Sequence, residues 1–176
     1  DIIGDLHSCC TELQLLFNKL GYSFVSGQGI YKHPYSIPIF VGDIIDRGYG
    51  PVGTFTLIRD MVQAGVAKLV RGNHDDKLFR YGCGRKIIQN HGLDKTIIKL
   101  EEAGIEKEEI TEFFKTIPYY FAYEDLIVTH AAWHKGMELL SPFDKRCRTF
   151  CLYGPTTGKT LPDGLPDRID WAITRK

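Results

Sequence analysis

The fold is indicated by residues 37–48, IPIFVGDIIDRG, in which a strand-like apolar run ends directly on acidic and basic side chains. The same order recurs at residues 2–7, IIGDLH, and at residues 66–75, VAKLVRGNHD, where Gly and then Asp, Asn or His follow an apolar run. Because the carboxyl ends of parallel strands meet at one edge of a sheet, these side chains are expected to converge. Oxygen and imidazole ligands gathered in this way suit hard or borderline divalent metals.

Helical periodicity separates the three clusters. Residues 11–20 carry apolar side chains at the i, i+3, i+4, i+7 spacing of one helix face. Residues 22–36, which contain Gly and Pro, are interpreted as a loop, and a second helix is predicted between Pro51 and Gly65. This repetition of strand, cluster and helix predicts an α/β fold with ligands at the carboxyl ends of its strands.

Beyond residue 75 the pattern changes. The predicted helices are residues 94–103 and 107–117, and a predicted hairpin has its strands at 119–123 and 126–130. The Gly-, Pro- and Thr-rich stretch 154–168 is interpreted as a loop. His130 ends the second strand of the hairpin; alone, such a residue is more often a satisfied core histidine, but beside three similar clusters it becomes a candidate metal ligand.

Composition limits the possible partners. The 176 residues are 43% hydrophobic and 25% charged, which is enough for one domain with a substantial core. Lys and Arg number 22, as do Asp and Glu, so no overall basic field indicates a nucleic-acid or membrane surface. The apolar runs are too short to span a membrane, and five Cys, an odd number, fit reduced thiols better than disulfides. We therefore expect a cytoplasmic location and no membrane association.

The combined motifs resemble those of the calcineurin-like metallophosphoesterases. Residues 4–7, 42–48 and 72–75 match the patterns Gly-Asp-x-His, Gly-Asp-x-x-Asp-Arg-Gly and Gly-Asn-His-Glu/Asp. Residues 91–93 and 151–158 are similar to two subfamilies, the phosphatase module of bacterial polynucleotide kinase-phosphatase and the PrpE-type symmetrical bis(5'-nucleosyl)-tetraphosphatase. The resemblance implies an α/β four-layer sandwich in which two mixed β-sheets are flanked by helices.

The resemblance also implies metal ligands. Asp5, His7 and Asp43 would hold a first divalent metal, and Asp43, Asn73 and His130 would hold a second. Mn²⁺ suits this mixed oxygen and nitrogen set best, and Fe or Zn also fit it. The family's last metal His, in a Gly-His-Thr-like motif, is absent from the 176 residues. We therefore expect residues 1–176 to be a metallophosphoesterase domain that is C-terminally truncated, with an incomplete second site.

Further roles concern the substrate. By the resemblance, His74 would donate a proton to the leaving oxygen or contact the phosphate, and Asp46 would orient it. Arg47 would bind phosphate oxygens, for which its planar guanidinium is suited. Arg80 and Arg146 lie in basic stretches that could also bind substrate, although a solvated helix face is the simpler interpretation of such stretches.

The expected function is that of a phosphoesterase with two divalent metals. Its substrates would be phosphate esters or anhydrides of nucleotides or of nucleic-acid ends, attacked by a metal-activated water. A protein serine/threonine phosphatase shares these motifs and is one alternative. The other alternative is a non-catalytic binding scaffold, which an incomplete metal site would favour and the intact acidic and histidine clusters oppose.

Overall fold

The computed structural model describes residues 1–174. The helices are α1 (Cys10–Lys19), α2 (Pro51–Gln63), α3 (Asn73–Gly82), α4 (Leu93–Glu102), α5 (Lys107–Lys115), α6 (Lys145–Tyr153) and α7 (Trp171–Thr174), with a 3-10 helix, η1, at Lys135–Leu139. The strands are β1 (Ile2–Ile3), β2 (Ser23–Val25), β3 (Ile30–Lys32), β4 (Ile39–Phe40), β5 (Lys68–Leu69), β6 (Tyr120–Tyr123), β7 (Leu126–Thr129), β8 (Thr156–Thr160) and β9 (Pro166–Arg168).

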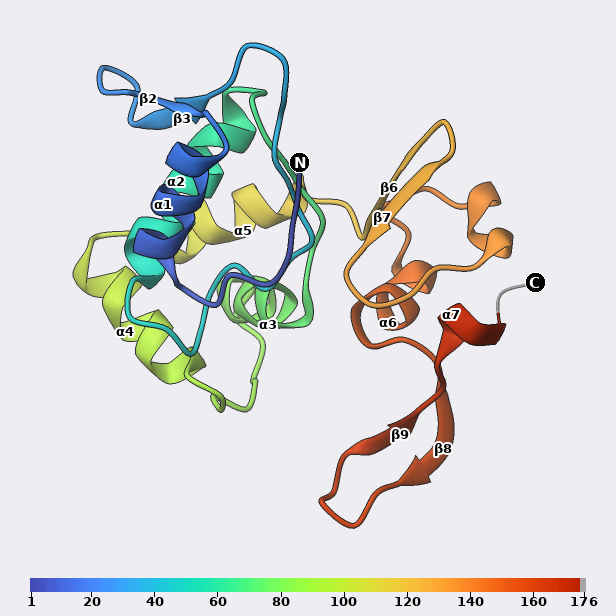
Figure 1. The fold of residues 1–176 in the computed structure, drawn as a ribbon. Helices are drawn as coiled ribbons and strands as arrows, with labels where there is room; N and C mark the ends of the chain where they lie inside the picture. Colours follow the sequence, from blue (N-terminus) through green and yellow to red (C-terminus); the bar gives the residue numbers. More distant parts are fainter. Residues whose placement is uncertain (175–176) are drawn as a thin grey trace.

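The elements are arranged in two adjoining parts (Figure 1). The larger part contains β1–β5 and α1–α5, and the smaller part contains the β6–β7 hairpin, η1 and α6, from which β8–β9 projects. This arrangement confirms the α/β class. Within residues 1–174 the sheets are one parallel sheet in the order β1-β4-β5 and three antiparallel pairs. The resemblance implied two mixed sheets, and the described residues form these four sheets instead, because each antiparallel strand pairs with its hairpin partner alone.

The parallel sheet brings the predicted clusters together. β4 lies in the middle, with Ile39 opposite Ile2 on one side and opposite Lys68 on the other. The pairing continues past the short strands, since Val41 N–H donates to Ile3 O and Val70 N–H donates to Phe40 O, both at 3.0 Å. All three strands run in the same direction, so the residues that follow them emerge at the same edge.

The helices of the larger part bury most of the faces that the sequence predicted, although in α1 only Leu13 and Phe17 are buried and Leu16 and Leu20 are 36% and 39% exposed. In α2, Pro51 occupies the first turn, where its missing N–H costs nothing, and Phe55, Ile58 and Met61 are completely buried. Each such side chain contributes roughly 1.5–3 kcal/mol when it leaves water. No helix among residues 1–174 has the length and apolar character needed to cross a membrane.

Two segments that were expected to be loops form hairpins, so those expectations were wrong. In the first, β2 pairs with β3, and Ile30 and Tyr31 of β3 are buried against Phe17 of α1, whose ring centroid lies 5.0 Å from that of Tyr31. In the second, β8 pairs with β9, and every residue of β8 is exposed. Tertiary packing decides the first hairpin and backbone pairing the second, and neither leaves a clear hydrophobic alternation in the sequence.

The smaller part is joined to the larger one through buried charges. The predicted hairpin of β6 and β7 is confirmed, and α6 packs beneath it with Cys147, Cys151 and Leu152 buried. Arg148 of α6 donates from Nε to Asp76 of α3 at 2.9 Å. Ala131, which follows His130, donates its N–H to Cys151 O of α6 at 2.8 Å, so α6 connects the end of β7 to α3.

Candidate metal centre

Two loops that follow β1 and β4 hold unusual backbone conformations. Within residues 1–174, positive φ angles at residues other than glycine are concentrated here: His7 43°, Ser8 62°, Asp43 51°, Asp46 70° and Arg47 60°. Each left-handed residue costs roughly 1–2 kcal/mol, which tertiary contacts must offset. Backbone bonds between the loops do this, since His7 N–H donates to Asp43 O at 2.9 Å and Ser8 N–H donates to Ile44 O at 3.0 Å.

Asp75 fixes the third cluster to the second. Its buried carboxylate accepts backbone N–H bonds from Asp43 at 2.9 Å, Ile44 at 3.0 Å and Gly72 at 2.9 Å. In return, Asp43 Oδ1 accepts the His74 N–H at 2.9 Å. Burial, followed by the nearby Asp43 carboxylate, raises the pKa of Asp75 above its ordinary value. The sequence analysis assigned Asp75 no role beyond matching the motif.

Three imidazoles expose the same ring nitrogen to one point. Nδ1 of His7 lies 3.1 Å from Ile45 O, and Nδ1 of His130 lies 2.8 Å from Val41 O. A carbonyl oxygen only accepts, so Nδ1 carries the proton in both rings and Nε2 keeps its lone pair. In His74, Nδ1 lies 2.6 Å from Asp46 Oδ2, which fixes the ring in the same way. Holding Nδ1 like this is how proteins prepare histidines to bind a metal through Nε2.

The lone pairs converge on one carboxylate oxygen. Asp43 Oδ2 lies 4.0 Å from His7 Nε2, 4.0 Å from His74 Nε2 and 3.6 Å from His130 Nε2. These separations are too long for hydrogen bonds and of the size that a cation between two ligand atoms produces. The rings of His7 and His74 meet edge to face, with their centroids 4.9 Å apart.

Asn73 adds a second acceptor. His130 Nε2 lies 3.0 Å from Asn73 Oδ1, and with the proton of His130 on Nδ1 neither atom has a proton to share. A cation bound by both atoms would relieve that repulsion. The donor set of Asp43, Asn73 and the histidines therefore fits a divalent metal, as the chemistry of its ligands requires.

Asp5 lies at the edge of this group. Its side chain is 48% exposed, and its Oδ1 is 3.7 Å from His130 Nδ1. The most compact set of possible ligands is His7, Asp43 and His74, whose ligand atoms all lie within 4.8 Å of one another. The structure thus brings all five residues expected to bind metal to one place, together with His74, which was expected to be catalytic and whose Nε2 lies as far from Asp43 Oδ2 as that of His7 does, 4.0 Å.

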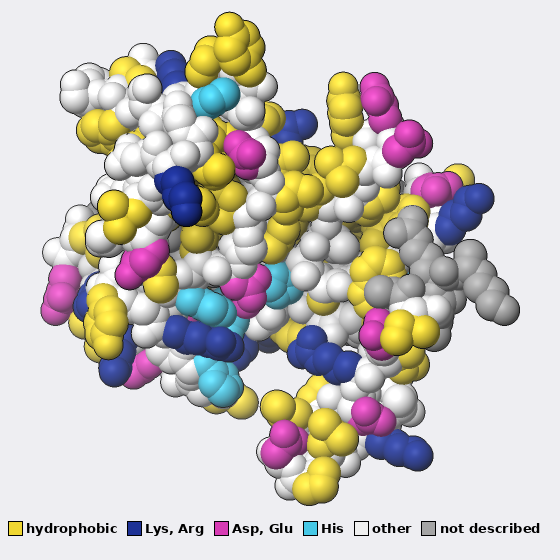
Figure 2. Space-filling model, in the orientation of Figure 1, with side chains coloured by type: hydrophobic (Ala, Val, Ile, Leu, Met, Phe, Trp, Pro, Cys, Tyr) yellow, Lys and Arg dark blue, Asp and Glu magenta, His cyan; other side chains and the backbone are white. Residues whose placement is uncertain are grey.

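Arg47 extends the site on the side of His74. Its Nη2 lies 3.5 Å from His74 Nε2, and its side chain is exposed. Histidine, basic and acidic side chains gather on the face of the molecule in front of α3 (Figure 2). This arrangement places an exposed guanidinium, a group whose geometry suits phosphate oxygens, beside the centre.

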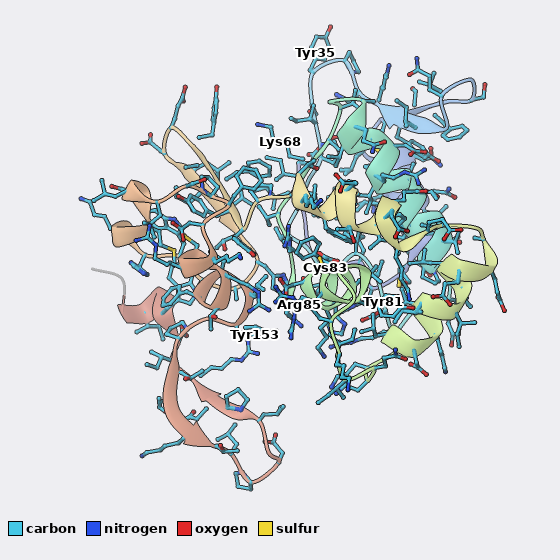
Figure 3. The ribbon with its side chains drawn as sticks, turned by 180° about the vertical axis from the view of Figure 1, so that it is seen from behind. Tyr35, Lys68, Tyr81, Cys83, Arg85 and Tyr153 are labelled. Atoms are coloured by element: carbon cyan, nitrogen blue, oxygen red, sulfur yellow. The ribbon has the colours of Figure 1, made fainter. Side chains whose placement is uncertain are left out.

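The other expected substrate-binding residues lie elsewhere. The Arg146 guanidinium is held by Asp144, with Nη2 2.6 Å from Oδ2, on the outer surface of α6. Arg80 belongs to α3 and acts electrostatically on Tyr153, whose side chain comes from the end of α6 (Figure 3). No contact in the described chain joins Arg80 or Arg146 to Asp43 or His74, so their role stays a prediction.

The buried pair of Asp76 and Arg71 was missed by the sequence analysis. Asp76 is 1% exposed and Arg71 is 4% exposed, and Arg71 also stacks on the Phe79 ring at 4.3 Å. Both residues flank the third cluster, and their polar side chains gave no signal of burial. A charged residue directly before a Gly-Asn-His motif was the only available indication.

Comparison with known proteins agrees with this site. The sequence profile described as "Calcineurin-like phosphoesterase" matches residues 1–172. Together with the fold and the gathered ligands, this match establishes that the chain belongs to the calcineurin-like phosphoesterase family, as its motifs predicted.

Two curated relatives carry the same name, "Bis(5'-nucleosyl)-tetraphosphatase PrpE [asymmetrical]". The relative from Halalkalibacterium halodurans is 41% identical over 182 residues, covering 99% of this chain and 72% of the relative. The relative from Bacillus subtilis is 34% identical over 179 residues, covering 98% and 72%. Both names carry the word asymmetrical, which differs from the symmetrical type expected from the motifs.

One solved structure shares the fold, and a second gives a weaker match. A mutant cold-active protein tyrosine phosphatase matches with a TM-score of 0.52 and 17% identity, covering 78% of this chain and 43% of that one. A structure described as a diadenosine tetraphosphatase matches with a TM-score of 0.49 and 23% identity, and this chain spans only 50% of it.

Proposed function

We propose that this chain is a metal-dependent phosphoesterase that hydrolyses phosphate esters or anhydrides of nucleotides, with dinucleoside tetraphosphates as its first candidate substrates. The observation that carries the proposal is the convergence of three Nδ1-anchored histidines on Asp43 Oδ2. The family match and the names of the curated relatives support the reaction and the nucleotide class. Two divalent cations, Mn²⁺ or else Fe or Zn, form part of the proposal.

The proposed ligand roles follow the family pattern. Asp5, His7 and Asp43 hold one cation, and Asp43, Asn73 and His130 hold the other. When bound, such cations polarise a phosphoryl oxygen and lower the pKa of a water molecule toward neutrality. The distances from Asp43 Oδ2 to His7 Nε2 and His130 Nε2, 4.0 and 3.6 Å, support the assignment of Asp43 to both sets.

The remaining roles concern the phosphate and the proton. Asp46 orients His74 through the 2.6 Å contact at Nδ1, and in its doubly protonated form His74 would donate the Nε2 proton to the leaving oxygen. Arg47 binds phosphate oxygens beside His74 and keeps the phosphoryl group in place. Arg80 and Arg146 stay in the proposal only as peripheral contacts for a long substrate.

A neighbouring pocket supports a nucleotide substrate. It measures about 270 Å³, begins at Asp5 and His130, and is also lined by Tyr153, Arg168 and Trp171. Aromatic faces beside a phosphate site can stack on a nucleobase, and base stacking tolerates any base. A protein serine/threonine phosphatase would have to bind a peptide, rather than a nucleobase, in this pocket.

The test is hydrolysis in the presence of Mn²⁺. Diadenosine tetraphosphate, p-nitrophenyl phosphate, a 2',3'-cyclic nucleotide and a phosphopeptide are compared, and the first is expected to give the highest kcat/KM. Replacing the acid–base histidine in His74→Ala should lower kcat by about 10²–10⁴-fold. Asp43→Asn should abolish Mn²⁺-dependent hydrolysis, since both ligand sets use this residue.

Each alternative predicts a different result. Preference for the phosphopeptide would replace the proposal with a protein serine/threonine phosphatase. No turnover of any of the four substrates at saturating Mn²⁺ would favour the binding scaffold.

Two wider statements complete the proposal. Residues 1–176 belong to a single metallophosphoesterase domain, of which they are a part, and the match over residues 1–172 supports this assignment. The location is cytoplasmic, which the free thiols of Cys9, Cys10, Cys83, Cys147 and Cys151 support.

A further inference from the structure

A second pocket is lined by Arg47, the residue beside His74. It measures about 200 Å³ and lies between the loop of residues 47–51 and α4. Its lining residues are Arg47, Gly48, Tyr49, Pro51, Gly92, Lys95, Thr96 and Lys99. Three of them are cationic, and Asp and Glu are absent from this lining.

The two lysines face the pocket together. Lys95 and Lys99 are four residues apart on α4, which places them one above the other on the same helix face. Lys99 Nζ donates to Tyr49 O at 2.9 Å, so its ammonium points across the pocket toward the loop that carries Arg47. Like charges at this spacing repel each other, and an anion bound between the two ammonium groups would be attracted by both and would offset their repulsion.

The pocket wall is fixed to the metal centre by a tight contact. Gly92 precedes α4 with a φ of 93°, and a Cβ at this position would lie 2.7 Å from Arg47 N. Only glycine lets the start of α4 approach the loop so closely. The lysines therefore keep a set distance from Arg47, whose Nη2 is in turn 3.5 Å from His74 Nε2.

We propose that this pocket binds the distal phosphates of a phosphoanhydride chain while the reacting phosphoryl group lies at the metal centre. The inference rests on the proposed function and names the part of the substrate that the site selects. Arg47 is shared, because it lies between the centre and the pocket. A chain of several phosphates carries enough charge to interact with all three cations, whereas a phosphomonoester offers a single phosphate group.

The test compares two double variants with the same change in charge. Lys95→Gln/Lys99→Gln removes both ammonium groups from the pocket, and Lys19→Gln/Lys115→Gln removes two exposed ammonium groups on α1 and α5. The measured quantity is kcat/KM for diadenosine tetraphosphate divided by kcat/KM for p-nitrophenyl phosphate. We expect the pocket variant to lower this ratio about tenfold, from two weakened charge contacts, and the control to leave it unchanged.

A binding measurement separates the pocket from catalysis. Calorimetric titration with inorganic tripolyphosphate, in metal-free buffer, should show about tenfold weaker binding to the pocket variant than to the control. Equal binding to both variants, or an equal substrate ratio, would overturn the proposal. If the unmodified chain turns over none of the substrates, the proposed function fails, and the tripolyphosphate titration still decides whether the pocket binds a phosphate chain.

Discussion

The close approach of Gly72 to Asp43 allows a sharp test of how the centre is built. A Cβ at Gly72 would lie 2.3 Å from both Asp43 N and Asp43 Oδ1. The backbone of Gly72 has φ −89° and ψ 174°, which any residue adopts without strain. The whole effect of Gly72→Ala is therefore a collision with the metal-binding loop.

The size of this effect follows from the atoms involved. Overpacking usually costs about 1–3 kcal/mol, and here the colliding atom is backbone held by Asp75, so we expect about 3 kcal/mol of lost unfolding free energy. Asp43 Oδ1 must also move, which should weaken Mn²⁺ binding by about tenfold or more. Urea unfolding and calorimetric Mn²⁺ titration measure the two quantities.

Gly27→Ala is the matched control. A Cβ at Gly27 meets nothing within 4 Å, so its unfolding free energy should stay within about 0.5 kcal/mol of the parent. The steric reasoning is refuted if Gly72→Ala unfolds at the same urea concentration as Gly27→Ala and binds Mn²⁺ equally well.

Three further predictions follow from the same contacts. Asp75→Asn should lower the unfolding free energy, measured in urea, by about 1–3 kcal/mol, because at least one of the three backbone N–H groups that donate to the carboxylate loses its acceptor. An unchanged urea midpoint would contradict the idea that Asp75 holds these backbone groups together. Asp46→Asn should lower kcat by about 10–100-fold and leave the Mn²⁺ affinity unaltered, because Asp46 orients His74. Asp5→Ala should weaken Mn²⁺ binding. If Asp46→Asn weakens Mn²⁺ binding and Asp5→Ala does not, His74 rather than Asp5 is the metal ligand. Mn²⁺ at a hundred times its Kd should stabilise the parent chain by about 2.7 kcal/mol, read as a raised Tm. Asp43→Asn should lose most of that gain, and an equal gain would place the metal elsewhere.

The competing scaffold hypothesis meets a physical difficulty in the strained loops. Left-handed backbone at Asp43, Asp46 and Arg47 costs stability, and so does burial of Asp43 and Asp46, which are 3% and 1% exposed. Strain and buried carboxylates concentrated at one place are characteristic of functional sites. This combination favours the enzyme over a surface that only binds.

Local sequence patterns were enough to predict the α/β class, the helix that begins at Pro51, the hairpin of β6 and β7, and the clusters of side chains that the structure gathers at the candidate centre. These features have local causes: apolar periodicity, Pro and Gly at helix ends, and motif spacing after short strands. The sequence also located His130, although 87 residues separate it from Asp43 along the chain.

Which atoms face one another could be known only from the three-dimensional arrangement of the chain. The clamp of Asp75, the proton positions on the histidines and the burial of Asp76 with Arg71 depend on partners far away in the chain. The strands of residues 23–32 form because Ile30 and Tyr31 pack against α1, and the lysine pocket exists because Gly92 lets α4 touch Arg47. Long-range packing sets these features, and local sequence patterns carry no record of it.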